Sequence, residues 1–174
     1  MREFESEHIL YREMTVDDTD NVLTWRNSEA VRSQFFYQDI ITKEDHLNYI
    51  DNKIKTGKSL QFILKDKETG EEFGCCYFSN IEGKIAEIGI FFGVTNFKGK
   101  GYGKETIKRF SEYGFNDLGF ERIDTRIKSG NMPSIMSHKR AGFNENDELY
   151  DKYEFNCNRD EIVFMSLYKD MENK

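Results

Sequence analysis

A glycine-rich turn is the segment of this chain whose composition points most directly to chemistry. In Gly99-Lys100-Gly101-Tyr102-Gly103, three glycines lie between an expected strand and an expected helix. Backbone N–H groups of such a turn converge on an anion at the positive end of the helix dipole. The turn therefore predicts a phosphate-binding loop, and a flexible surface turn is the alternative that these residues alone leave open.

Two widespread phosphate-binding patterns do not fit this turn. The Walker pattern requires glycine where Lys98 stands and serine or threonine where Glu105 stands. The dinucleotide fingerprint requires a third glycine where Lys104 stands, and the expected upstream strands form a meander instead of a strand-helix unit. The sequence therefore predicts neither a Walker loop nor a dinucleotide-binding fold.

A second polar cluster follows the next expected strand, at Asn131, Ser134, His138 and Gly142-Phe143. Together with Lys98-x-x-Gly101-x-Gly103, the segment from Asn131 to Phe143 resembles the coenzyme-binding motifs of the Gcn5-related N-acetyltransferase (GNAT) superfamily. The order of elements agrees from His8 to Lys169. Lys98 is a mild departure, because the family usually has arginine or glutamine there.

The resemblance implies acetyl-CoA as cosubstrate and direct transfer of its acetyl group to a primary amine. It also implies that turn amides bind the coenzyme's pyrophosphate, that the preceding strand pairs with the pantetheine arm, and that residues at the next helix start contact the coenzyme. The implied coenzyme-binding residues are Phe92, Gly93, Val94, Lys98, Gly99, Lys100, Gly101, Tyr102, Gly103, Lys104, Asn131 and Ser134.

The chemistry requires a route for the amine's proton, because only a neutral amine attacks a thioester. Glu87 resembles the general-base glutamate of the histone-acetylating branch and is the expected base, acting directly or through water; a structural strand carboxylate is the alternative. A family tyrosine that protonates the thiolate is replaced by His138, which is the expected acid unless it is structural. Other candidate acids are Ser134, Ser137 and Tyr150.

The developing oxyanion is expected to meet a backbone N–H near Phe92, Gly93 or Val94, where parallel strands would splay around the coenzyme.

The acceptor is expected at an aromatic and basic stretch whose candidate substrate-binding residues are Trp25, Arg26, Asn27 and Arg32. This stretch resembles two branches of the family, one acetylating protein N-termini of the ribosomal-protein alanine type and one acetylating nucleotide-linked amino sugars. Stacking and arginine-phosphate pairing favour the nucleotide-linked amino sugar. The alternatives are a protein N-terminus, a purely structural role for this stretch, and a non-catalytic acyl-CoA-binding module.

The elements that must position these residues form one mixed α/β domain over residues 1–174, with a splayed sheet of about seven strands and about four helices. Strands are expected at 8–12, 60–65, 73–79, 85–92, 120–127, from Phe143 and at 162–169. Helices are expected from Thr15, from Thr42 to about Gly57, at 104–116, and from Asn131 to Ala141-Gly142, with a polar loop at 156–160. The crossover after residue 92 makes the sheet mixed.

The amino-acid composition argues against several classes of binding partner. A formal net charge of −7 argues against nucleic acid and anionic lipid, and no long apolar run is present. Neither Cys75, Cys76 and Cys157 nor the scattered histidines show metal-ligand spacing, so we expect no metal, reduced thiols and a cytoplasmic location. A homodimer is compatible with these residues.

Overall fold

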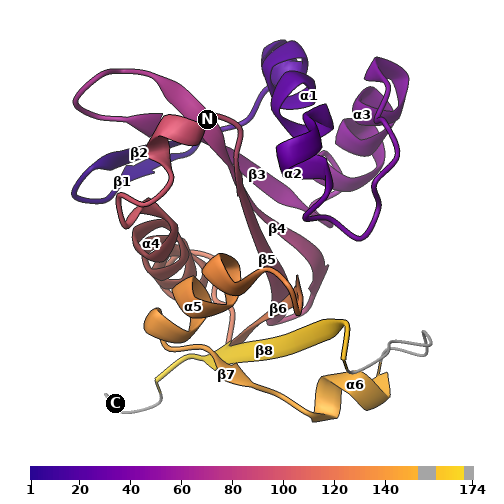
Figure 1. The fold of residues 1–174 in the computed structure, drawn as a ribbon, viewed down its shortest axis with the longest axis vertical. Coiled ribbons are helices and arrows are strands. Elements are labelled where there is room, and N and C mark those ends of the chain that lie inside the picture. The colour runs from indigo at the N-terminus through magenta and orange to yellow at the C-terminus, as the bar shows by residue number, and fades with distance from the viewer. Residues whose placement is uncertain (153–159, 171–174) are drawn as a thin grey trace.

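The computed structural model describes residues 1–152 and 160–170 of the chain. One mixed sheet carries eight strands in the order β1-β2-β3-β4-β5-β6-β8-β7. Figure 1 shows helices α1, α2 and α3 on one side of this sheet and α4 and α5 on the other. The strands are β1 (Glu3–Glu5), β2 (Ile9–Glu13), β3 (Leu60–Asp66), β4 (Glu72–Glu82), β5 (Ile85–Phe92), β6 (Arg122–Lys128), β7 (Asn144–Glu145) and β8 (Ile162–Tyr168).

The helices follow the start and stop signals of the sequence. Thr42 and Asp45 form a capping box, in which each side chain accepts a hydrogen bond from the other residue's backbone N–H. Asn131 caps α5, and Pro133 lies in its first turn. The helices are α1 (Thr19–Asn27), α2 (Glu29–Arg32), α3 (Lys43–Tyr49), α4 (Tyr102–Asn116), α5 (Met132–Arg140) and α6 (Glu148–Lys152), with short turns at Val16–Asp18, Ile50–Ile54 and Thr95–Phe97.

The central strands form the expected antiparallel meander. β3 pairs with β4 and β4 with β5, joined by turns in which Gly70 and Gly83 adopt positive φ. After β5 the chain crosses over through α4 and returns as β6, which pairs parallel to β5. The mixed sheet predicted from the sequence is therefore confirmed.

Two apolar clusters hold the sheet between its helix layers. Phe62, Phe78 and Ile123 pack with Ile107 and Phe110 of α4 in the larger cluster. The smaller cluster lies under α1, α2 and the turn after α3; its buried members are Met14, Val22, Val31, Ile50, Ile63, Cys75 and Phe91. Each face of β5 is thus covered by a different group of helices.

The structure adds elements that the sequence did not predict. Among the described residues, eight strands and six helices replace the expected seven and four, because β1, α2 and α6, which contain three to five residues each, were not predicted. Elements this short carry too few residues for a hydrophobic period to be visible. Of the loop expected at 156–160 only Asp160 lies within the described residues, and Cys157 lies outside them.

Candidate functional site

Strands β5 and β6 pair over only three residues and then diverge. Their parallel pairing joins Ile85, Ala86 and Glu87 to Arg122, Ile123 and Asp124, and ends there although both strands continue. Beyond Glu87, therefore, one side of β5 has no β6 ladder. An opening of this kind exposes main-chain donors and acceptors that a ligand with amide groups can pair with.

The alternation of ladder bonds shows which amides of β5 face that opening. Gly93 N–H and Val94 N–H both donate to Phe73 O, at 2.8 and 3.2 Å, so they face β4. Lys84 lies an odd number of residues before Gly93, and successive residues of a strand direct their main-chain groups to opposite sides. Its carbonyl oxygen accepts from Glu121 N–H at 2.8 Å, so the main-chain groups of Lys84 face β6. Phe92 lies an even number of residues after Lys84, so its main-chain groups face the opening. Of the three residues considered for the oxyanion, Phe92 has the suitably directed N–H.

The glycine-rich turn delivers free amides to the start of α4. Gly99 and Gly101 adopt φ of +81° and +83°, a region that favours glycine. Gly101 is the N-cap of α4 and no side chain caps it, so the first-turn N–H groups point away from the helix without an intrahelical partner. The helix begins at Tyr102, two residues earlier than predicted. This donor set suits a diphosphate.

Helix α5 packs against the start of α4 and closes one side of the turn. A Cβ on Gly103 would lie 3.2 Å from Ser137 Oγ, so the absence of a side chain allows the two helices to approach. Asn131 Oδ1 accepts from Ser134 N–H at 3.3 Å. The cap occupies the carbonyl oxygen of Asn131 and leaves its amide NH₂ for a ligand.

His138 is buried on α5. Its Nδ1 lies 2.9 Å from Ser134 O, a pure acceptor, so Nδ1 carries the hydrogen. Burial lowers the pKa of His138 to about 4, which leaves the ring neutral near pH 7 and Nε2 unprotonated. Nε2 is buried without a hydrogen-bond partner among the described residues. The geometry favours the structural role for this histidine over proton donation.

Glu87 lies at the last rung where β5 pairs with β6. Arg126 Nε donates to its Oε1 at 2.7 Å and Asn80 Nδ2 to its Oε2 at 3.1 Å. The Glu87 side chain is 12% exposed, so a water molecule has limited access to it. The guanidinium of Arg126 lies 5.8 Å from the centre of the Phe36 ring. The carboxylate is therefore joined, through Arg126, to the loop that follows α2.

A cavity of about 530 Å³ lies between this loop and the loop after β6. It brings Asn131, expected at the coenzyme, together with Phe36, which follows the stretch expected at the acceptor. Its lining residues are Ser33, Gln34, Phe36, Lys128, Ser129, Gly130, Asn131, Glu161 and Ile162. Two regions predicted separately from the sequence thus share one concave surface.

The sequence profile of the family described as acetyltransferase (GNAT) domain matches residues 8–144. This range includes the splayed strands, the glycine-rich turn and α5. The chain belongs to the GNAT acetyltransferases. It is an acetyl-CoA-dependent N-acetyltransferase, as its sequence predicted, and acetyl-CoA is its cosubstrate.

Individual relatives agree with this family. The chain is 28% identical over 169 residues to the "Uncharacterized N-acetyltransferase p20" of Bacillus licheniformis, covering 94% of both chains. Its fold resembles a spermidine N-acetyltransferase from Vibrio cholerae, solved with CoA and spermine, with TM-score 0.80, 18% identity, and coverage of 94% and 96%. It also resembles the ribosomal-protein-S5-alanine acetyltransferase of Vibrio fischeri, with TM-score 0.77, 19% identity and full coverage of both chains. At these identities the two structures confirm the GNAT fold alone.

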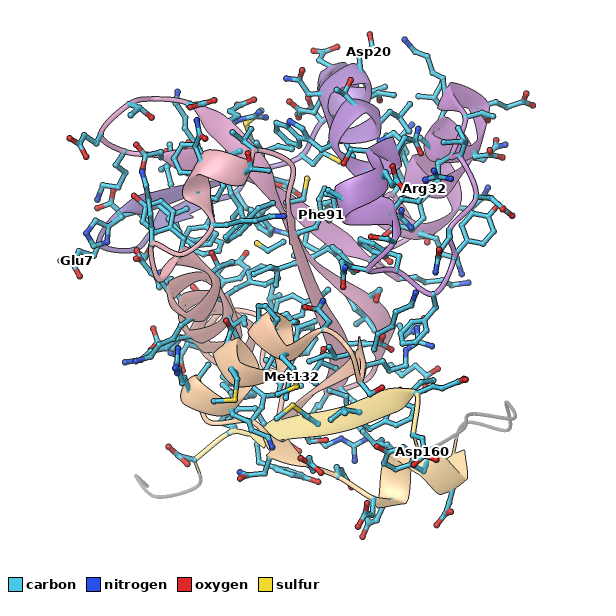
Figure 2. The ribbon with its side chains drawn as sticks, viewed as in Figure 1. Glu7, Asp20, Arg32, Phe91, Met132 and Asp160 are labelled. Carbon is cyan, nitrogen blue, oxygen red and sulfur yellow. The ribbon has the colours of Figure 1, made fainter. Side chains whose placement is uncertain are left out.

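Within the GNAT domain, the residues expected to bind the acceptor hold the loop at 33–41. Arg26 Nη2 donates to Tyr37 O at 2.9 Å, and Arg32 Nη1 donates to Gln38 O at 2.9 Å. Asn27 exchanges two hydrogen bonds with the backbone of Ile41. Figure 2 shows Arg32 beside this loop. These side chains fix the main chain of the loop.

Trp25 contributes to the floor of the same region. A Cβ placed on Gly93 would overlap Trp25 Cγ, so the indole lies directly on the backbone that follows the end of β5. Trp25 also packs against the smaller apolar cluster. It connects the stretch expected to bind the acceptor to the segment expected to bind pantetheine.

Sequence reasoning missed three polar residues that position the site. Arg126 binds Glu87, Asp66 accepts from Tyr102 Oη at 2.6 Å, and Glu105 binds the β1–β2 turn. The hydrogen bond to Asp66 raises the pKa of Tyr102 to about 12. No local signal marks these residues, because each pair is far apart in the chain.

No group of three His, Cys, Asp or Glu side chains suited to a metal ion was found among residues 1–152 and 160–170. In the same residues, no helix is both long and apolar enough to cross a membrane.

Proposed function

We propose that this GNAT domain acetylates the primary amine of a small molecule that carries an anionic group, with a nucleotide-linked amino sugar as the best-supported class. The observation that carries the proposal is an arginine pair without acidic partners. The arginine ion pairs found in the described part of the chain belong to Arg2, Arg12, Arg122 and Arg126. Arg26 and Arg32 therefore have no carboxylate partner there.

Both arginines retain buried hydrogen-bonding capacity. Arg26 Nη1 and Arg32 Nε are buried and lack a hydrogen-bond partner among the described residues. Desolvation by burial lowers the pKa of Arg26, and the neighbouring charge of Arg32 acts in the same direction. Because an uncompensated buried cation is costly, an anionic ligand would be stabilised beside this pair.

Aromatic side chains flank the arginine pair and suit the rest of such a molecule. Arg26 lies 3.6 Å from the centre of the Phe35 ring. Phe36 and Tyr37 on the same loop are 44% and 60% exposed. An exposed aromatic ring offers a stacking surface to a base or sugar. Phe36 also lines the cavity that contains Asn131.

The coenzyme is proposed to lie across the β5–β6 opening. The first-turn amides of α4 would bind its diphosphate, and main-chain groups of β5 would pair with its pantetheine amides. Phe92 N–H is then the donor directed at the thioester oxygen. The residues present fit this cosubstrate, since the turn supplies unpartnered amides and Gly103 keeps α5 close to it.

Glu87 is proposed as the base that accepts the amine's proton through water. Arg126 donates to one of its oxygens and Asn80 to the other, and these bonds fix the carboxylate beside the opening between β5 and β6. His138 is not given the acid role, because its neutral ring has no hydrogen to donate at Nε2. Tyr150 Oη donates to Ile162 O at 2.8 Å and is an alternative source of a proton.

Acetyl-CoA-dependent thiol release against a panel of amines tests the proposal. The panel contains amino-sugar nucleotides, the same amino sugars without nucleotide, peptides beginning with alanine, and spermidine. The last two follow the substrates in the names of the structural neighbours. We expect kcat/KM to be highest for amino-sugar nucleotides, and Glu87→Gln to lower kcat on the same acceptor.

Arg32→Gln examines the arginine pair. We expect KM for the amino-sugar nucleotide to rise about tenfold, the size of one lost hydrogen bond to a charged group, and KM for acetyl-CoA to stay unchanged. Arg140→Gln, at an exposed arginine that ends α5, is the matched control. Faster turnover of spermidine or of peptides than of any nucleotide would reject the proposed acceptor and leave the acetyltransferase activity standing.

A further inference from the structure

The turn between β1 and β2 forms hydrogen bonds with Glu105 in the first turn of α4. Ser6 Oγ and His8 N–H both donate to Glu105 Oε1, at 2.6 and 2.8 Å. His8 Nδ1 lies 2.9 Å from Glu105 Oε2. Figure 2 labels Glu7, which lies between these two donors at the tip of the hairpin. Three donors from residues 97 and 99 positions away thus converge on one carboxylate.

Glu105 lies where a negative charge opposes coenzyme binding. It is in the first turn of α4, whose N–H groups have no side-chain cap. A carboxylate in a first helical turn is attracted to those N–H groups and to the positive end of the dipole. Left without other partners, Glu105 would compete with a phosphate for the same amides.

Glu105 is instead held at the outer side of the helix. Its side chain is 19% exposed, and both of its oxygens accept hydrogen bonds from the hairpin. The hydrogen bond with Glu105 raises the pKa of His8. Glu7, 3.8 Å from His8 Nε2, adds to this effect.

A second anchor fixes the same helical turn. Tyr102 donates to Asp66 at the end of β3, and His8 stacks on the Tyr102 ring at 5.8 Å. Asp66 also accepts from Thr69 N–H at 2.7 Å. Since Tyr102 remains anchored without His8, loss of the hairpin contacts would release mainly the Glu105 carboxylate.

We propose that Ser6 and His8 are positioning residues for coenzyme binding, which hold the Glu105 carboxylate away from the amides of the glycine-rich turn and so leave those amides to the diphosphate. The inference rests on the proposed placement of the diphosphate at this turn. It makes a hairpin near the N-terminus a determinant of acetyl-CoA affinity without contact to the coenzyme.

Calorimetric binding to the whole protein, which requires no acceptor, tests this inference. Dissociation constants are measured for acetyl-CoA and for S-acetylpantetheine, which lacks the diphosphate. The variants are Ser6→Ala/His8→Ala, which removes the two side-chain donors and keeps the His8 N–H bond to Glu105, then Glu105→Gln, and the triple variant. We expect the double variant to weaken acetyl-CoA about fivefold, the size of a charge effect at a helix end, and to leave S-acetylpantetheine unchanged. The triple variant should recover the affinity for acetyl-CoA.

Arg109→Gln is the matched control for docking of the hairpin. Arg109 Nε donates to Glu5 O at 2.8 Å, so this variant loosens the same hairpin from the same helix and leaves Glu105 bound. The inference is overturned if Arg109→Gln weakens acetyl-CoA as much as the double variant does. It is also overturned if the triple variant fails to recover affinity, since a structural effect alone would persist.

Gly101→Val separates this inference from the coenzyme placement on which it rests. A β-branched residue at the φ of +83° would distort the turn. If this variant leaves acetyl-CoA affinity unchanged, the diphosphate does not lie at the turn and the proposed placement fails. If it abolishes binding and the Ser6/His8 variant does not weaken it, only the positioning role is rejected.

Discussion

The two halves of this site are immobilised by opposite means. On the side proposed to bind the coenzyme, carboxylates anchor the structure: Asp66 accepts from Tyr102, and Glu105 binds the β1–β2 turn. On the side proposed to bind the acceptor, cations do so: Arg26 and Arg32 donate to backbone carbonyls of the loop at 33–41. In the proposed placement, the first arrangement would leave main-chain N–H groups for a phosphate, and the second would leave guanidinium nitrogens for an anion.

The contact between Trp25 and Gly93 joins the two halves, so a substitution at this contact tests whether they depend on each other. Gly93→Val would overlap the indole near its Cβ, where the side chain has little freedom to move. We expect a loss of about 3 kcal/mol in the free energy of unfolding, typical of severe overpacking, measured by urea denaturation. Both coenzyme and acceptor binding should weaken in the folded fraction.

Gly130→Ala is the control, because no atom lies within 4 Å of the position its Cβ would take. Combining Gly93→Val with Trp25→Ala should restore part of the lost stability. Equal stability of Gly93→Val and wild type would show that the two halves are not packed on each other here.

Lowering the pH should lower the free energy of unfolding through His138, which lies on α5 beside the turn proposed to bind the coenzyme. Its folded pKa of about 4 lies below the ordinary 6.5, so the unfolded chain binds a proton that the folded chain does not in that window. Stability is therefore fully present above pH 6.5 and falls as pH decreases toward 4. Between pH 6.5 and 5 we expect a loss of about 2 kcal/mol.

The measurement is urea denaturation across this pH range for wild type and His138→Gln. The variant should show a shallower dependence on pH, whatever its stability at pH 7. Some dependence will remain, because burial also lowers the pKa of His46. An unchanged slope in the variant would contradict a buried, neutral His138.

The smallest expected effect lies on the acceptor side alone. Phe36→Ala removes a half-exposed ring that lines the cavity and lies near Arg126. We expect KM for the acceptor to rise about threefold, in the range of an exposed cation–π contact, and the dissociation constant of acetyl-CoA to stay the same. Ile40→Ala, at an exposed loop residue outside the cavity lining, is the control. A change in coenzyme affinity would show that this loop serves both halves.

The backbone conformation of the glycine-rich turn and the cap of α5 could be predicted from the sequence, whereas the contacts of Arg26 and Arg32 could not, for a physical reason. Main-chain geometry at a phosphate turn requires particular residues, and Gly101 at positive φ and Asn131 at a helix cap are visible as such in the sequence. Their contact with the coenzyme remains a prediction. Arg26 and Arg32 were expected to bind substrate, yet the structure also gives each a backbone carbonyl of the loop. Nothing local reveals such a partner, since a carbonyl is present at every residue.

The boundaries of the strands and helices show the same limit of prediction from local sequence. β5 was predicted with its observed bounds, because its apolar run ends at clear turn residues. The start of α4 was placed two residues late, since Tyr102 and Gly103 belong by composition to the turn. The Glu87–Arg126 contact joins strands β5 and β6 across the crossover and depends on their register, which no hydrophobic period specifies.

The anchoring of the loop at 33–41 has a consequence for how acceptor choice can change over generations. Arg26, Arg32 and Lys128 grip this loop by the carbonyls of Tyr37, Gln38 and Ser33, which every amino acid possesses. Apart from Phe35, which packs against Phe91 and Arg26, the side chains of this loop can consequently change without loosening its attachment to the scaffold. Under the proposed function, new acceptor preferences would arise from a few surface substitutions in this loop, and the part of the domain that binds the acetyl donor would be inherited unchanged.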